Sequence, residues 1–376
     1  VKAWIGSRDF EEDAFDHVQQ ARRQPGSTFK PFVYAEAFRQ GARPDDRLID
    51  QALEIAVGGA EVWRPTDGGP PSGEAMSLSD GLAYSKNTIT AQLIQQVGPA
   101  KVAALARKMG VRQSTLDAVP SLALGTSPVT LKEMVAAYGT IANGGGYLEP
   151  MLVTRIEDRD GQVIEEFSPE DPDIALEREA AYTLLDSMRG VINRGTGRGI
   201  RSRYGIRADV AGKTGTTQDN ADGWFILMHR QLVAGAWVGF NDGRVTLRSD
   251  YWGQGAHSAL PIVGDFFGNA LRARIIDPRV RFTAPEDTGL LARIRGWFQS
   301  LFAPEPVAEP KPQRTVKPAQ EQEAREEPAT PAPVVVPPQP EGDPLQDKID
   351  QIMKESDEAE LIETEPSPSK QEETFR

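Results

Sequence analysis

The chain has 376 residues, with 39% hydrophobic residues, a mean hydropathy of −0.44 and a formal net charge of −13 at pH 7. This length suits one large domain or two ordinary ones. The absence of cysteine excludes thiol catalysis, disulfides and cysteine-ligated metals. It suits a bacterial periplasmic protein, although cytosolic proteins can lack cysteine too. Residues 303–376 hold 18 acidic and 8 basic residues, which leaves residues 1–302 with a net charge of −3 and no sign of a nucleic-acid surface.

The N-terminal third alternates short strands and helices. Residues 2–6 read as a strand, and the Pro25-Gly26 turn precedes a helix over 27–39. Further along, the pattern predicts a β excursion at 52–67, a loop at 68–73, and helices at 77–83, 88–97, 99–109 and 131–142. The last of these helices opens with a capping box, Thr130 to Glu133.

The C-terminal half is dominated by strands. A hairpin is expected from strands 151–157 and 162–167, followed by an amphipathic helix at 176–192. Further strands are expected at 208–213, 223–230, 233–239 and 244–248, and a last helix at 261–274. This order predicts an α+β fold with an antiparallel sheet. No repeat of fixed period is present.

Three short motifs carry the candidate chemistry. Ser27 and Lys30 are three residues apart, so on a helix they share one face. A serine hydroxyl is a weak nucleophile without a base, and Lys30 serves as that base only if its pKa falls far below about 10.4. Desolvation or a nearby cation would lower this pKa, and Lys213 is the candidate cation. Taken alone, the pair also fits a helix start with a solvated lysine.

The second motif is Ser85-Lys86-Asn87, in the break between two helices. Ser85 could pass a proton to a leaving amine, and Asn87 could hold a substrate amide through its donor and its acceptor. Lys86 is expected to point to solvent. Ser and Asn are also common in plain loops.

The third motif is Lys213-Thr214-Gly215-Thr216 on a predicted edge strand. Lys213 with the Thr214 and Thr216 hydroxyls would bind a carboxylate, and Gly215 would admit a substrate backbone. The N–H groups of Thr216 and Ser27 could form an oxyanion hole. A lysine that only blunts the edge strand is the plainer alternative. A phosphate-binding loop is disfavoured because Arg207 stands where it needs a glycine.

Other residues give weaker signals. His17, His229 and His257 are scattered outside any metal-ligand pattern, so no metal and no cofactor are predicted. Trp63, in a polar loop, is the tryptophan expected to border a cleft and contribute to substrate binding.

Ser-x-x-Lys, Ser-x-Asn and Lys-Thr-Gly, in this order, are the signature set of penicillin-recognising serine acyl-transferases. The flanks Arg22-Arg23-Gln24-Pro25-Gly26-Ser27-Thr28-Phe29-Lys30-Pro31 and Lys213-Thr214-Gly215-Thr216-Thr217-Gln218-Asp219-Asn220 resemble those of bifunctional (class A) penicillin-binding proteins. The middle helices and Trp237-Val238-Gly239 are similar too, so the resemblance covers about residues 1–275.

The resemblance implies the transpeptidase fold: a five-stranded antiparallel sheet flanked by helices, with an all-helical subdomain. It implies a serine D,D-transpeptidase that cross-links peptidoglycan stem peptides. Ser27 would attack a D-Ala-D-Ala donor, an amine acceptor would take the acyl group, and β-lactams would acylate Ser27. Catalytic roles fall to Ser27, Lys30, Ser85, Asn87 and Lys213.

Other functions of the same site stay open. A D,D-carboxypeptidase or a β-lactamase would use water as acceptor, although no Glu-x-x-Leu-Asn segment lies between Asn87 and Lys213 to activate it. A β-lactam-binding sensor and a silent scaffold are alternatives of other classes. The intact motifs argue against the scaffold.

The expected organisation is a transpeptidase domain at 1–280, a linker or amphipathic helix at 281–302, and a disordered acidic tail at 303–376 rich in proline and glutamate. No apolar run is long enough for a membrane span. We therefore expect an upstream segment to anchor a periplasmic domain to the inner membrane, near membrane-associated cell-wall machinery.

Overall fold

The computed structural model describes residues 1–58, 61–217, 220–247 and 249–285. The chain divides into two units, Val1–Ala303 and Pro304–Arg376, and every described residue belongs to the first. Most of the expected linker and the whole expected tail therefore lie outside the described residues.

An antiparallel sheet of three strands, in the order β11-β10-β9, organises this unit. The strands are β9 (Val210–Thr216), β10 (Asp222–His229) and β11 (Leu232–Gly239). In the register, Ile226 at the centre of β10 pairs with Lys213 on one side and Gly235 on the other. All of β10 is buried, which explains its nearly continuous apolar sequence. The order leaves β9 at one edge of the sheet.

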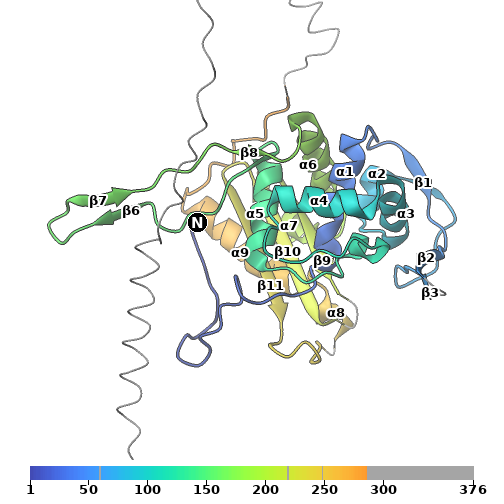
Figure 1. Ribbon diagram of the computed structural model, residues 1–376, viewed down its shortest axis with the longest axis horizontal. Coiled ribbons are helices and arrows are strands. Elements are labelled where there is room, and N and C mark those ends of the chain that lie inside the picture. Colours follow the sequence, from blue (N-terminus) through green and yellow to red (C-terminus); the bar gives the residue numbers. More distant parts are fainter. Residues whose placement is uncertain (59–60, 218–219, 248, 286–376) are drawn as a thin grey trace, which may run out of the picture. The chain divides into compact units, whose positions relative to one another are not determined.

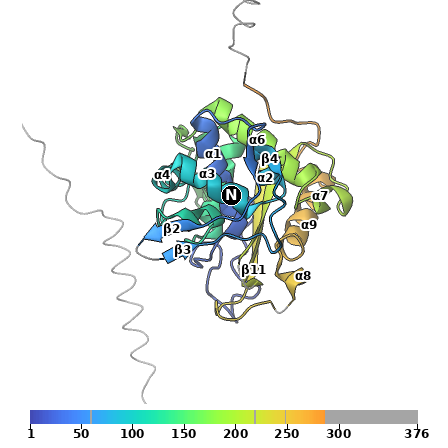
Figure 2. The same ribbon diagram turned by 90° about the vertical axis from the view of Figure 1, so that its right-hand side faces the viewer.

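Alternate side chains of β10 pack into two separate hydrophobic cores. Trp224 and Ile226 belong to a large core built with helices on one face, whereas Phe225 and Leu227 belong to a smaller core on the other. Helices α1, α5 and α6 contribute to the large core and α9 to the small one (Figures 1 and 2). The α+β class predicted from the sequence is confirmed.

Helices cover both faces with bounds close to those predicted. They are α1 (Lys30–Arg39), α2 (Leu78–Ala83), α3 (Asn87–Val97), α4 (Pro99–Met109), α5 (Leu131–Ala142), α6 (Arg178–Asn193), α7 (Gly199–Ser202), α8 (Asp250–Gly253) and α9 (Ala259–Arg272), with 3₁₀ turns η1 (Gly26–Phe29) and η2 (Pro120–Leu124). Pro31 lies in the first turn of α1, where its missing N–H has no helical acceptor to lose.

Short two-stranded ribbons complete the described part. They are the pairs β1 (Arg47–Ile49) with β4 (Ala75–Ser77), β2 (Ile55–Gly58) with β3 (Glu61–Trp63), β5 (Gly146–Tyr147) with β8 (Asp173–Ile174), and β6 (Arg155–Glu157) with β7 (Val163–Glu166). The β excursion predicted near residue 60 and the hairpin predicted near residue 160 are both confirmed.

Two predicted strands do not form. Residues 2–6 run irregularly: Ile5 is 77% exposed, and Trp4 Nε1 donates to the Asp16 carboxylate at 3.0 Å instead of packing on the sheet. Residues 244–247 are also irregular. Among the described residues the main sheet thus has three strands rather than the five expected. An apolar stretch becomes a strand only where it meets a partner edge.

The predicted capping box at the start of α5 is confirmed and extends further than expected. The buried Glu133 carboxylate accepts hydrogen bonds from the Thr130 N–H, the Ser114 N–H and hydroxyl, and the Gln113 N–H. Burial alone would raise the pKa of this carboxyl, but these hydrogen bonds outweigh it and hold the pKa below its ordinary value. Glu133 therefore joins α5 to the loop after α4.

Glu133→Gln is expected to destabilise the fold by roughly 2 kcal/mol at pH 7, because one buried acceptor becomes a donor. A depressed carboxyl pKa contributes stability above the unfolded pKa, and this stability is lost as pH falls through the folded pKa. The difference from wild type in urea unfolding should therefore shrink on acidification below about pH 4. Glu165→Gln, on the exposed β7, is the control. A difference independent of pH would contradict this role.

Candidate active site

The edge strand β9 buries one lysine completely. Lys213 has no exposed side-chain surface, and its Nζ donates to Ser85 Oγ at 2.8 Å and to the Thr214 carbonyl at 3.1 Å. The sequence predicted an edge lysine either blunting the strand or binding a ligand. The structure excludes the blunting role, because a lysine that protects an edge is exposed.

The segment that carries Ser27 packs directly on the end of β9. A Cβ placed on Gly26 would lie 2.5 Å from the Thr216 oxygen, and a Cβ placed on Gly215 would lie 2.6 Å from the Pro25 oxygen. Gly26 also has a φ of +54°, so glycine suits it on both counts. The close approach at Gly215 is thus made by the Ser27 segment. A substrate contact there remains a prediction.

Ser27 is the half-buried position in an otherwise buried run. Thr28, Phe29 and Lys30 are fully buried, and the Tyr138 hydroxyl fixes the turn by donating to the Thr28 carbonyl at 2.7 Å. In the part of the chain that the structure describes, the Ser27 hydroxyl makes no hydrogen bond. The geometry leaves this hydroxyl available to a ligand.

Ser85 lies between two lysine side chains because of the way α2 ends. The Lys86 N–H bonds to the Gly81 carbonyl and the Ser85 N–H to the Leu82 carbonyl, which is a Schellman motif with Ser85 at the position that glycine usually holds. Ser85 accordingly has a φ of +60°. This turn directs its carbonyl and hydroxyl to Lys30, whose Nζ lies 2.5 Å from Ser85 O and 3.3 Å from Ser85 Oγ.

Asn87 lies beside Lys30, the lysine that also contacts Ser85. Its Oδ1 accepts from Lys30 Nζ at 2.6 Å, and its Nδ2 donates to the Thr66 carbonyl at 2.5 Å. The sequence predicted that Asn87 would offer a substrate both its acceptor and its donor. In the structure Oδ1 accepts one bond from Lys30 and keeps a second lone pair, and Nδ2 keeps one further N–H, so the substrate contact remains a prediction.

Burial lowers the pKa of both lysines. The pKa of Lys30 falls to about 7, mainly through desolvation, with Asp67 raising it and Lys86 lowering it further. Desolvation also lowers the pKa of Lys213 well below its ordinary value, and repulsion from Lys30 adds to this. Burial, one of the two causes expected from the sequence, has the largest effect on the pKa of Lys30, and Lys86 is a cation that lowers it and was not foreseen.

The predicted orientation of the Lys86 side chain is wrong. It was expected to point to solvent, but its Nζ forms an ion pair with the fully buried Asp50 at 2.9 Å and lies 3.7 Å from Asp67. The helical spacing could not show this, since Asp50 and Asp67 come from distant segments of the chain.

The two threonines of β9 lie on the opposite face of the strand from Lys213. The Thr214 hydroxyl pairs with the Thr196 hydroxyl at 2.6 Å, and the Thr216 hydroxyl accepts from the Gly255 N–H at 3.2 Å. A carboxylate site shared by Lys213 and the two hydroxyls remains a prediction. The sequence analysis did not identify Thr196, because its contact with Thr214 joins segments 18 residues apart.

Two backbone N–H groups meet where η1 packs on β9. The Thr217 N–H bonds to Asp222 O across the sheet, so by alternation the Thr216 N–H faces the open edge. Ser27 is in the first turn of its helix, where N–H groups have no helical acceptor. A Cβ on Gly26 would lie 3.2 Å from the Thr216 nitrogen, which places the two donors close together.

Trp63 ends β3, three residues before Thr66, and its side chain is half-buried. Within the described residues, no hydrogen bond joins it to Lys30, Ser85, Asn87 or Lys213. Its part in substrate binding remains a prediction.

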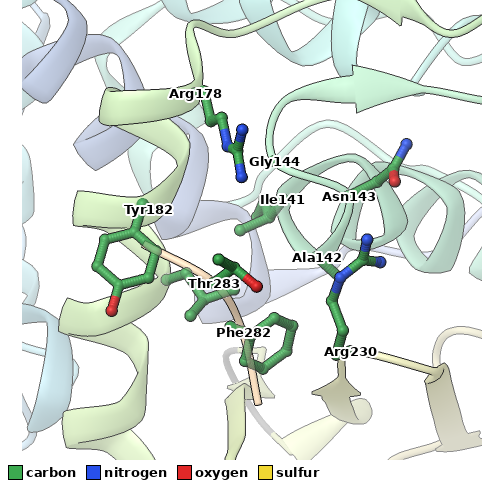
Figure 3. Close-up of a pocket in the computed structure, with 10 residues that line it drawn as sticks. Ile141, Ala142, Asn143, Gly144, Arg178, Tyr182, Arg230, Phe282 and Thr283 are labelled. Atoms are coloured by element: carbon green, nitrogen blue, oxygen red, sulfur yellow. The ribbon is translucent and has the colours of Figure 1, made fainter. Parts of the chain in front are cut away.

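A pocket of about 320 Å³ lies at the other end of the sheet (Figure 3). Arg178, Arg230 and Phe282 are among the residues that line it. None of the predicted site residues lines it. Arg230 follows His229, which pairs with Val210 at the end of β9 opposite Thr216. This pocket is separate from the candidate active site.

Among residues 1–285, apart from the undescribed positions, no group of three His, Asp or Glu side chains could hold a metal ion. In the same residues no helix is long and apolar enough to cross a membrane.

A serine at the start of a buried helix, a Ser-x-Asn turn and a lysine on the edge strand converge in one α+β unit. This arrangement defines the class of proteins with the β-lactamase and transpeptidase fold. Comparisons with known proteins identify the family within it.

A family model described as the penicillin-binding protein transpeptidase domain matches residues 1–231. Penicillin-binding protein 1A of Neisseria gonorrhoeae is 32% identical over 280 residues, which is 73% of this chain and 34% of that protein. Its counterpart in Rickettsia conorii is 32% identical over 316 residues, covering 78% of this chain and 39% of the relative.

Solved structures agree. The crystal structure of penicillin-binding protein 1A from Haemophilus influenzae has a TM-score of 0.69 at 26% identity and covers 75% of this chain and 47% of its own. PonA1 of Mycobacterium tuberculosis has a TM-score of 0.64 at 22% identity, covering 84% and 81%. This chain belongs to the transpeptidase domain family of penicillin-binding proteins. It spans about a third of the length of the curated relatives it matches.

Proposed function

We propose that this chain is a serine D,D-transpeptidase that cross-links peptidoglycan stem peptides through an acyl-enzyme on Ser27. The observation that carries the proposal is the convergence of Lys30 and Lys213 on the hydroxyl of Ser85, beside the helix that bears Ser27. A neutral amine has two N–H donors and one lone pair. The two short bonds from Lys30 use its donors, so its lone pair is left to accept a proton.

In the first half-reaction, Ser27 Oγ attacks the carbonyl between the two D-Ala residues of the donor, and its proton passes to Lys30. The N–H groups of Ser27 and Thr216 stabilise the resulting oxyanion. Ser85 relays the proton to the nitrogen of the leaving D-Ala. The C–N bond then breaks and leaves an ester on Ser27.

In the second half-reaction, an amine of another stem peptide attacks this ester. Lys30 accepts the proton that the amine loses, and the Ser27 oxygen leaves with that proton as the new amide forms. The carboxylate of the substrate would bind at the hydroxyls of Thr214 and Thr216, with Thr196 beside them. Asn87 would give its remaining N–H to a substrate carbonyl.

β-Lactams would acylate Ser27 as mimics of the donor. Penicillin-binding protein A of Mycobacterium tuberculosis has been solved as imipenem and penicillin G acyl-enzyme complexes, with TM-scores of 0.58 to this chain. The proposed substrate belongs to the bacterial cell wall, so the reaction would take place in the periplasm, next to the membrane-associated machinery that builds the wall.

The test supplies a soluble D-Ala-D-Ala peptide with an excess of a labelled D-amino acid as acceptor. We expect release of D-Ala and transfer of the label into the peptide. Release of D-Ala without transfer would indicate a carboxypeptidase instead. Failure both to release D-Ala and to form a β-lactam adduct would overturn the proposal.

Lys213→Ala is expected to lower the acylation rate by about 10²-fold, because Ser85 loses the donor that fixes its hydroxyl and the carboxylate loses a nearby cation. The rate is measured by stopped-flow with a fluorescent penicillin. Lys101→Ala, on the exposed face of α4, is the control and should match wild type. Unchanged acylation in Lys213→Ala would contradict this role.

A further inference from the structure

An ion pair behind the Ser-x-Asn turn holds Asn87 against Lys30. Asp67 Oδ1 accepts from the Asn87 N–H at 2.6 Å, and the neighbouring Thr66 carbonyl accepts from Asn87 Nδ2 at 2.5 Å. The Thr66-Asp67 segment therefore binds Asn87 at two points. The remaining polar atom of the Asn87 side chain, Oδ1, is directed to Lys30 Nζ at 2.6 Å.

The other member of the pair is Lys86, the residue before Asn87. Its ammonium group lies 2.9 Å from Asp50 and 3.7 Å from Asp67. Asp50 is fully buried and also accepts from the Thr88 hydroxyl at 2.6 Å and from the Ser72 N–H and hydroxyl at 3.1 and 3.0 Å. This network therefore holds two carboxylates, Asp50 and Asp67, and the ammonium group of Lys86, next to the Asn87 that binds Lys30.

We propose that Asp67 and Lys86 are positioning residues for acylation: they fix Asn87 on Lys30 and, with opposite signs, set the pH at which Lys30 becomes able to accept a proton. This inference rests on the proposed function of Lys30 as the base. Neither residue touches the reacting atoms, and both act through Asn87 and through their charges.

Asp67 and Lys86 have opposite effects on the pKa of Lys30 because their charges are opposite. The carboxylate of Asp67 favours the charged form of Lys30 and raises its pKa, whereas the ammonium of Lys86 disfavours that form and lowers it. The other ionisable groups around Lys30 are Lys213 on β9, Asp50 beyond Lys86, and the buried hydroxyl of Tyr34 on α1. Asp50 is coupled to the pair, because Lys86→Gln leaves its carboxylate without that cation. The freed negative charge favours the charged form of Lys30, which is the same direction as the loss of the Lys86 charge itself.

The test compares Asp67→Asn with Lys86→Gln, in the full chain. The second-order rate of acylation by a fluorescent penicillin is measured from pH 5.5 to 9. The acid limb of this profile is the rise of the rate with pH as Lys30 loses its proton. For Asp67→Asn we expect the acid limb to move to lower pH by about 0.5–1 unit. The rate at pH 6 divided by the rate at pH 8 should then rise about threefold to fivefold. For Lys86→Gln we expect the limb to move to higher pH and the ratio to fall by a similar factor.

Opposite shifts distinguish this role from a structural one, because loss of packing lowers the rate at every pH. The double variant should return the limb to near its wild-type position. Lys132→Gln and Glu149→Gln, which neutralise another ion pair of the unit (3.4 Å), are matched controls and should leave the profile unchanged.

Shifts in the same direction, or none, would overturn the inference while leaving the proposed function intact. Absence of acylation in the wild type would instead remove the proposed function. If Asp67→Asn does not fold, as judged by thermal unfolding, Lys86→Gln and Lys86→Met carry the test, and a limb that stays in place or moves to lower pH in both refutes it.

Discussion

Replacement of Ser27 by alanine is expected to abolish the covalent adduct with penicillin while the protein stays folded. Ser27 is half-buried near the start of η1, and its hydroxyl makes no hydrogen bond within the described residues. Loss of the hydroxyl removes the attacking atom, whereas an alanine fits the same turn without strain.

Intact mass spectrometry after treatment with penicillin measures this result. Wild type should gain the mass of one penicillin and Ser27→Ala should gain none. Ser202→Ala, an exposed serine at the end of α7, should label like wild type. A persistent adduct on Ser27→Ala would show that another nucleophile acts. The lifetime of the wild-type adduct adds a second result: a long-lived ester fits a transpeptidase, and turnover within seconds fits a β-lactamase.

Lys30→Arg is expected to lower the acylation rate by 10³-fold or more, since an arginine keeps its positive charge and cannot accept a proton. In wild type the pKa of Lys30 is about 7, so the rate should rise as pH increases from 6 to 8 and Lys30 becomes neutral. In the variant the acylation rate should be low and should no longer rise between pH 6 and pH 8.

Stopped-flow acylation over pH 6–8 measures both effects. Lys30→Gln, which is smaller and neutral, guards against a loss caused by the bulk of arginine in a fully buried position. Lys101→Arg is the exposed control. A normal rate and pH profile in both Lys30 variants would show that another group is the base.

The ordered motifs predicted much of this site because each motif is local. Ser27 lies in the 3₁₀ turn η1 and Lys30 begins α1 directly after it. Lys213 lies on a strand whose register follows from the apolar run of β10. The capping box at Thr130 and Glu133 and the bounds of α5 are local signals too, and both predictions were confirmed.

What the sequence could not show depends on contacts between distant segments. Lys86 was predicted to be solvated because Asp50 and Asp67, its partners, are 36 and 19 residues away along the chain. The strand predicted at residues 2–6 failed for the converse reason, since an apolar pattern does not supply a partner edge. The position of Thr196 beside Thr214 also arises only from packing.

The left-handed backbone conformation of Ser85 lowers the stability of the fold. A residue with a Cβ in the left-handed region is less stable than glycine by about 1 kcal/mol, yet glycine has no hydroxyl to join Lys30 and Lys213. Natural selection for thermal stability alone would favour glycine at this position, and selection for the proposed proton relay would favour serine. The serine seen here marks a point where the two selective pressures oppose each other, and any search for stabilising substitutions should leave this position unchanged.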